Sequence, residues 1–184
     1  MNEEQVKAFE SLLVELREEL FKACTNFDIC IQLWHTQEVV DVLNQYIGFF
    51  WPTKGAHFDQ FTIRVSEVLR TKQGAPSFYN VLRMLSQNAQ LAPNIDVRSL
   101  SDRLKKHKQV VKAIKQYRNT MAAHAYTQSS VVRKPVLFGK AKRLLQDLQN
   151  IFNEISIAHG NRPWRFTAEQ HNNASRLLET LKAR

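Results

Sequence analysis

Two residues of one helical segment carry the side chains that RNA cleavage without a metal requires. Arg118 has a planar guanidinium, which can hold a phosphate through two parallel hydrogen bonds. His124 has an imidazole, which can take up a proton near neutral pH. Cleavage at a 2′-hydroxyl needs a base for that hydroxyl and a cation for the charge that develops on the phosphate. The pair therefore indicates a candidate ribonuclease site.

Each of these residues also has a structural interpretation. At about 100° per residue, Arg118 lies about 40° from Ile114, the centre of the buried stripe, and His124 lies about 80° away on the other side. A guanidinium is costly to bury alone, so Arg118 predicts an acid, a polar cavity or a partner subunit. An ion pair with an acid of the first half, such as Glu15 or Asp41, is one alternative. A hydrogen-bonded core histidine is the alternative for His124.

The positive charge of the chain is concentrated in its second half. Residues 1–96 hold 12 acidic and 8 basic side chains, whereas residues 97–184 hold 5 acidic and 18 basic ones. Clustered cations bind polyanions because they displace counterions from phosphates, so RNA is the expected partner. A solvated basic surface without a ligand is the alternative. The candidate RNA-binding residues are the lysine stripe beside the motif and its continuation, namely Lys105, Lys108, Lys112, Lys115, Arg133 and Lys134.

The pattern of apolar residues predicts helices throughout. Glycine and proline, five residues of each, are grouped near 48–55, 74–76, 93, 135–139 and 160–163, where loops are expected. Between these groups apolar residues recur every three or four positions, and no alternating strand pattern occurs. The sequence predicts an all-α fold, an antiparallel up-and-down bundle of about six to seven helices. We expect a single domain over 1–184 with an acidic half, 1–96, and a basic half, 97–184.

Several helix starts and apolar faces can be located. Thr36, Ser77, Ser99 and Thr167 are candidate N-caps, and Pro135 suits the first turn of a helix. The helix capped by Ser99 should continue past Ala123 and contain the motif. The expected core faces are Val6, Phe9, Leu13, Leu16, Leu20 and Ala23; Phe58, Phe61, Val65 and Val68; Leu137, Ala141, Leu144, Leu148, Ile151 and Ile155; and Ala174, Leu177 and Leu181.

Other classes of protein lack support in the sequence. No segment approaches the ~20 apolar residues of a membrane span, and no glycine-rich phosphate loop or GxSxG elbow is present. The histidines show no paired metal-ligand spacing, so we expect no metal and no cofactor. Cys24 and Cys30 lack CxxC spacing and are interpreted as free, buried thiols of a cytoplasmic protein. The tryptophans are interpreted as core or interface packing residues, with Trp164 the best candidate for an exposed RNA contact.

The motif and its surroundings resemble a known group of proteins. The string YRNTMAAHA, with Arg118, the polar Asn119 and then His124, resembles the signature of the HEPN superfamily. Residues 41–85 resemble its abortive-infection, AbiU-type branch, in which an "LN…FF" helix end and a Ser-capped short helix precede the signature. The proline-led helix and the C-terminal helix fit the same branch.

This resemblance implies an all-α HEPN bundle that usually forms a homodimer, with the two motifs facing each other across a basic cleft. It implies a metal-independent endoribonuclease of a toxin–antitoxin or anti-phage system. Arg118 would bind the scissile phosphate, His124 would act as general base or acid, and Asn119 would position them. The expected partners are RNA, a second copy of the chain and possible antitoxins. The alternative is a non-catalytic HEPN module that binds RNA or a protein such as an antitoxin, with Arg118 and His124 as interface residues.

Overall fold

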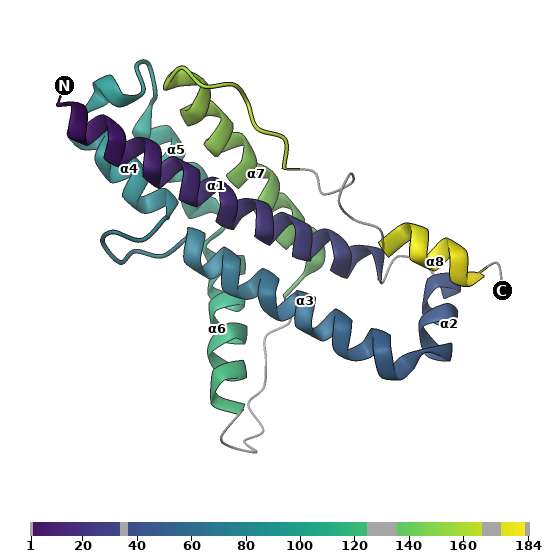
Figure 1. The fold of residues 1–184 in the computed structure, drawn as a ribbon. Coiled ribbons are helices and arrows are strands. Elements are labelled where there is room, and N and C mark those ends of the chain that lie inside the picture. Colours follow the sequence, from purple (N-terminus) through teal and green to yellow (C-terminus); the bar gives the residue numbers. More distant parts are fainter. Residues whose placement is uncertain (1, 34–36, 125–135, 167–173, 183–184) are drawn as a thin grey trace.

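Two long antiparallel helices, α1 (Glu3–Gln32) and α3 (Ile47–Val68), run side by side through the molecule (Figure 1). The computed structural model describes residues 2–33, 37–124, 136–166 and 174–182, and for residues 121–124 and 175 it describes the backbone only. These described residues form α-helices and one short 3-10 helix, with no strand among them. The all-α prediction is therefore confirmed.

The other helices surround this central pair. Figure 1 shows α7 along α1 on the side away from α3, and α6 crossing α3 so that its C-terminal end projects from the bundle. The remaining elements are α2 (Gln37–Gln45), α4 (Phe78–Gln87), the 3-10 helix η1 (Ala89–Leu91), α5 (Val97–Lys106), α6 (Lys108–His124), α7 (Phe138–Ala158) and α8 (Ala174–Lys182).

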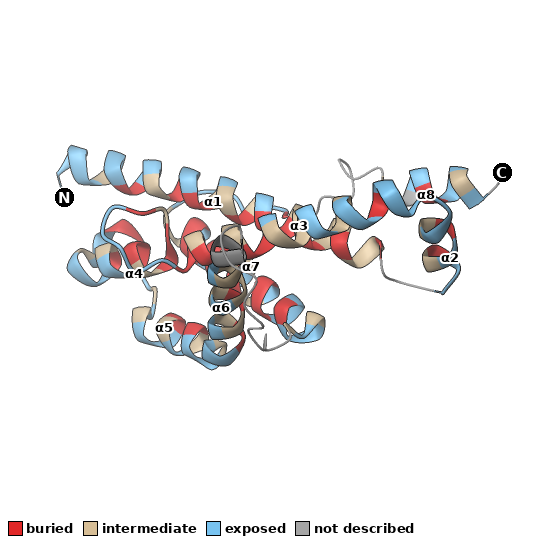
Figure 2. Cartoon of the chain, turned by 90° about the horizontal axis from the view of Figure 1, so that it is seen from below, coloured by how far each residue is buried: buried red, intermediate tan, exposed pale blue. Residues whose placement is uncertain are grey.

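The main core lies between α1, α3, α4, α5, α6 and α7. Figure 2 shows the buried residues along the inward side of each helix. The expected faces of α1 and α7 are in this core, with two departures: Val6 is only half-buried, and Leu137 is 52% exposed. Phe61 and Val65, from the expected face of α3, have no exposed surface. The helical period therefore located the core correctly along the three longest helices.

A second, smaller core joins α2 and α8 to the end of α1 and the start of α3. It consists of Leu33, Val39, Val42, Phe50 and Leu178. Lys182 of α8 also pairs with Glu38 of α2 at 3.1 Å. The face predicted for the last helix is wrong in part, because Leu178 is buried here while Leu177 is 44% exposed.

The first expected loop is helical instead. Gly48, Pro52 and Gly55 all lie inside α3, which begins at Ile47. A proline removes the backbone bond to the carbonyl four residues earlier, and here that carbonyl belongs to Gly48, which is exposed to solvent. Water can satisfy this group, so the helix continues through the proline.

The helix caps agree with the sequence in one case and differ in another. Ser77 caps α4, and its hydroxyl accepts a hydrogen bond from the backbone N–H of Asn80. Asp96, not Ser99, caps α5, because the Asp96 carboxylate accepts from the backbone N–H of Ser99 at 3.0 Å. The helix that was expected to begin at Ser99 and pass Ala123 is two helices, α5 and α6. The expected cap positions 36, 135 and 167 lie outside the described residues.

Replacement of Ile114 tests the packing that fixes α6 on the core. Ile114 has no exposed surface, so Ile114→Ala should lower the free energy of unfolding by about 2–5 kcal/mol, and Ile114→Val by about 0.5–1.5 kcal/mol. Urea denaturation followed by circular dichroism measures both. An Ile114→Ala variant as stable as Lys112→Ala, which changes an exposed residue of the same helix, would contradict this placement.

The two cysteines should be unreactive in the folded protein. Both are free and buried, and burial raises the pKa of each thiol from 9.0 to about 12. Native protein at pH 8 should therefore be alkylated by iodoacetamide on the order of a thousandfold more slowly than the urea-unfolded chain, as measured by mass spectrometry. The unfolded thiols ionise first, so the free energy of unfolding should fall as pH rises above 9. Equal labelling of the native and unfolded chains would contradict this prediction.

Candidate functional site

Helix α6, which contains the motif, begins where α5 ends at His107. The Nε2 atom of His107 lies 2.6 Å from a carboxylate oxygen of Asp147 in α7. Arg103, one turn earlier in α5, donates to Glu154 of α7 at 2.6 Å. These contacts attach the junction of α5 and α6 to α7. As a consequence, Lys105 lies on α5 and not on the motif helix.

The middle of α6 is anchored on α3. Ile114 is completely buried. The Tyr117 hydroxyl donates to Asp59 of α3 at 3.2 Å, and the Tyr117 ring packs edge-to-face on Phe58, with 4.9 Å between the centroids. Because Arg118 directly follows Tyr117, these contacts fix the backbone from which the motif side chains extend.

Arg118 lies at the edge of this interface, with its side chain 35% exposed. Its Nη2 and Nε atoms donate to the Asn119 side-chain oxygen at 3.0 and 3.3 Å. Its Nη1 atom lies 3.8 Å from a carboxylate oxygen of Glu67 on α3. The acidic partner from the first half is therefore present, but it is Glu67 and neither Glu15 nor Asp41.

His124 is the last residue of α6, and its side chain lies outside the described residues. The backbone of α6 is helical from Lys108 to His124. Six residues of helix correspond to a rise of about 9 Å and a rotation of about 240° away from Arg118. The Cα atoms of Arg118 and His124 therefore lie on different sides of the helix axis.

The predicted lysine stripe is divided between two helices. Lys105 is on α5 and pairs with Asp102 at 2.8 Å. Lys108 and Lys112 are exposed on α6, and neither forms an ion pair within the described part of the chain. These two lysines are the ones that remain available to a polyanion.

Lys115 has a different environment from the other lysines. Its ammonium group donates to the backbone carbonyl of Leu69, the C-cap residue of α3, at 3.2 Å. Burial and, to a smaller degree, the nearby Arg118 charge lower the pKa of Lys115. A cation at the end of a helix also interacts favourably with its dipole, so Lys115 helps to hold α6 on α3. Arg133 and Lys134 lie outside the described residues.

A groove of about 520 Å³ lies between α6 and the start of α7. Lys112 and Lys140 supply two cations to it, and Gln109 and Gln116 supply two amides. Asn119 follows Gln116 by one helical turn on α6. The complete lining is Gln109, Val110, Lys112, Ala113, Gln116, Leu137 and Lys140. The two glutamines were not predicted as site residues from the sequence, although their spacing of seven residues places them on one face of the helix.

The two described tryptophans lie outside the core. Trp51 on α3 is 68% exposed, and the Lys54 ammonium lies 4.9 Å from its ring centroid. Trp164, after α7, is 41% exposed. Core packing is therefore wrong for these two residues, and packing at an interface stays a prediction. Trp34 lies outside the described residues.

A metal-binding cluster and a membrane-spanning helix are both absent from the described residues. No group of three or more His, Cys, Asp or Glu side chains among them is arranged to hold a metal ion. Among the same residues, every helix is too short or too polar to cross a membrane.

Comparison with known proteins adds one finding. The comparisons with curated proteins and with solved structures gave no match. A family model described as AbiU2, of the HEPN group, matches residues 7–178, a range that includes α6 and the motif. The family model covers most of the 184 residues, and a HEPN family agrees with the all-helical fold. The chain belongs to the AbiU2 family of HEPN proteins.

Proposed function

We propose that this chain is a metal-independent endoribonuclease of the HEPN type that acts in abortive infection or as the toxin of a toxin–antitoxin pair. The observation that carries the proposal is the contact of Arg118 with Asn119 at the solvent-facing edge of α6, in a member of the AbiU2 family. Arg118 would bind the scissile phosphate, and the Asn119 oxygen would orient its guanidinium. His124 would act as general base or acid.

The proposed reaction needs a base, an acid and a cation. A neutral His124 imidazole takes the proton of the 2′-hydroxyl, and the 2′-oxygen attacks phosphorus. The bond from phosphorus to the 5′-oxygen breaks, and the 5′-oxygen leaves with the electron pair and takes a proton from an imidazolium. The products are a 2′,3′-cyclic phosphate and a 5′-hydroxyl. The Arg118 guanidinium stabilises the charge that develops on the non-bridging oxygens.

The ion pair with Glu67 leaves Arg118 available for this role. Its distance of 3.8 Å is long, and Glu67 makes a shorter contact of 2.9 Å with Arg70. Partly exposed ion pairs of this kind contribute only about 0–1 kcal/mol to stability. The guanidinium can therefore turn toward a phosphate at small cost, while Arg70 keeps Glu67 paired.

A second copy of the chain would complete the site. Within one straight helix, Arg118 and His124 start from different sides of the axis. Two motif helices that cross at a twofold axis would instead place Arg118 of one protomer opposite the partner subunit's His124. The C-terminal end of α6 projects from the bundle of described helices (Figure 1), as such a pairing would require. In this arrangement the lysines of both copies would line a basic cleft.

A non-catalytic module is the second candidate function. The observation that favours it is that Arg118 already has an acidic neighbour on α3, as a structural arginine would. In that case the basic face of α6 binds RNA or an acidic surface of an antitoxin, and no bond is cleaved.

Substitutions in the motif distinguish the two functions. In EDTA, wild-type protein should cleave single-stranded RNA and leave 2′,3′-cyclic phosphate ends. Arg118→Ala and His124→Ala should each reduce the rate by about 10²–10³-fold. Arg83→Ala is the control, because it removes an exposed arginine of α4, leaves both arginines beside Glu67 in place and should retain activity. Gel analysis and mass spectrometry of the ends measure the outcome.

The results of the cleavage experiment decide between the nuclease and the non-catalytic module. Loss of cleavage in both motif variants, with melting temperatures within a few degrees of wild type, supports the nuclease. Intact RNA that still binds to the wild-type protein supports the non-catalytic module. Cleavage that survives in His124→Ala contradicts the assignment of His124.

The groove between α6 and α7 should contribute to RNA binding through its cations. Lys112→Ala and Lys140→Ala should each reduce the slope of log K against log salt by about 0.7 for a single-stranded RNA, because each removes one phosphate contact. Lys7→Ala changes an exposed lysine near the start of α1 and serves as the control. Fluorescence anisotropy at several salt concentrations gives the slopes. Unchanged slopes for both groove variants would remove the groove from the interface.

A further inference from the structure

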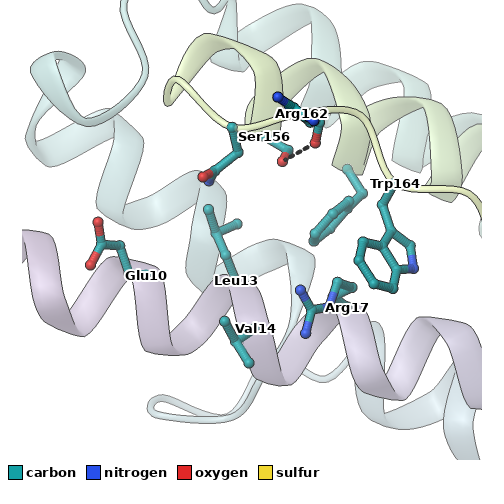
Figure 3. A pocket seen from close by; sticks show the side chains of 9 residues that line it. Glu10, Leu13, Val14, Arg17, Ser156, Arg162 and Trp164 are labelled. Carbon is teal, nitrogen blue, oxygen red and sulfur yellow. Dashed lines mark hydrogen bonds between the residues drawn. The ribbon is translucent and has the colours of Figure 1, made fainter.

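A second cavity, of about 440 Å³, lies between α1 and the segment that follows α7 (Figure 3). Its lining comes from α1, from the end of α7 and from residues 161–164. Arg17 and Trp164 stand at one end in Figure 3, and Glu10 stands at the other. The lining residues are Glu10, Leu13, Val14, Arg17, Phe152, Ser156, Asn161, Arg162 and Trp164. The volume is within the range of about 300–1,000 Å³ that is usual for small-molecule sites.

The segment that carries Trp164 is held firmly by α7. The Asn153 side-chain oxygen accepts from the backbone N–H of Trp164 at 2.8 Å, and the Asn153 amide donates to the Trp164 carbonyl at 3.0 Å. Two residues later, Phe166 is buried and packs edge-to-face on Phe152, with 5.4 Å between the centroids. One side chain thus fixes both backbone groups of Trp164, so the backbone that carries the indole is positioned before any ligand binds.

The start of the same segment is also fixed. The backbone N–H of Asn161 donates to the carbonyl of Ser156 at 2.9 Å, and the Ser156 hydroxyl donates to the carbonyl of Arg162 at 3.4 Å. Gly160 turns the chain with φ +92°, a value that side chains other than glycine rarely adopt. These contacts hold the backbone of Arg162 at the rim of the cavity.

The cavity combines an aromatic surface with cations. The Arg17 guanidinium lies over the Trp164 ring, 4.3 Å from its centroid, and Trp164 is nevertheless 41% exposed. Leu13 and Phe152 provide an apolar floor. Arg162 is exposed and forms no ion pair within the described ranges of the chain. Proteins hold unpaired bases by stacking on aromatic rings or on arginine planes, and arginine also binds phosphate. The Arg17 guanidinium, which also pairs with Glu18 at 2.9 Å, covers one face of the Trp164 ring, so the remaining exposed indole is the stacking surface.

We infer that this cavity binds a nucleobase together with its phosphate, either as a free nucleotide or as one unpaired residue of an RNA strand. The base stacks on the exposed indole of Trp164. The phosphate lies toward Arg162 and away from the carboxylate of Glu10. The cavity is formed by α1 and α7, whereas Arg118 faces Glu67 on α3. This site is therefore separate from the motif, and the inference does not depend on ribonuclease activity.

Titration calorimetry with AMP, adenosine and a ten-residue oligoadenylate tests the inference on the full chain. Wild-type protein should bind AMP or the oligomer. Trp164→Ala should weaken that binding at least about tenfold, since stacking contributes this much per base, while Trp164→Phe should retain most of it. Arg162→Ala should weaken binding of AMP and leave the weaker binding of adenosine unchanged. Trp51→Ala and Arg165→Ala are the matched controls for the two side chains.

The arms of the experiment separate the two sources of the ligand. Binding of both AMP and the oligomer indicates a free-nucleotide site, and binding of the oligomer alone indicates a contact for an unpaired base. Both results support the inference if Arg118→Ala leaves the Trp164-dependent binding intact. Absence of binding to either probe, or equal binding by wild type and Trp164→Ala, overturns it. Cleavage assays do not enter this comparison, so failure of the proposed nuclease activity would be seen separately.

Discussion

The burial of Ile114 and the packing of Tyr117 on Phe58 fix α6 to α3, and the location of the motif follows from that interface. Lys115 adds a hydrogen bond to the last carbonyl of α3. The last of the described contacts between the two helices is the long ion pair of Arg118 with Glu67, at 3.8 Å. The motif therefore lies on a regular helix whose middle is anchored on α3 and whose C-terminal end projects from the bundle. Rigid elements of this kind hold reacting groups more accurately than loops do.

The distribution of charge is better understood from the fold than from the sequence. The basic half has few acids, and three of them, Asp102, Asp147 and Glu154, contact cations of α5 or the histidine that ends it. The pairs of Asp147 and Glu154 connect α5 to α7, whereas the pair of Asp102 lies within α5. Lys112 and Lys140 of the groove form no ion pair within the described residues. The acidic half contributes Glu67 to the motif. The two halves thus meet at Arg118, and neither forms the surroundings of the motif alone.

The sequence was sufficient to predict the features of the fold that depend on local chemistry. The core faces of α1 and α7 followed from the helical period, and the cap at Ser77 followed from its hydroxyl and its position. Tertiary contacts decided the rest. Glu67 lies 51 residues from Arg118 and becomes its neighbour only because α3 and α6 cross. The break at His107 depends on Asp147 of another helix. In the same way, Gln109 and Gln116 line a groove only because α7 begins opposite them.

The small core at the far end of the molecule has a consequence for the dynamics of the fold. Leu33, Val39, Val42, Phe50 and Leu178 form a much smaller cluster than the main core, and in the described part of the chain α1 and α3 contribute to both clusters. Regions with few buried contacts open at a lower free energy than the whole protein and do so as separate cooperative units. We therefore expect α2 and α8 to open as such a unit, with backbone amides that exchange with solvent faster than those of α1 and α7.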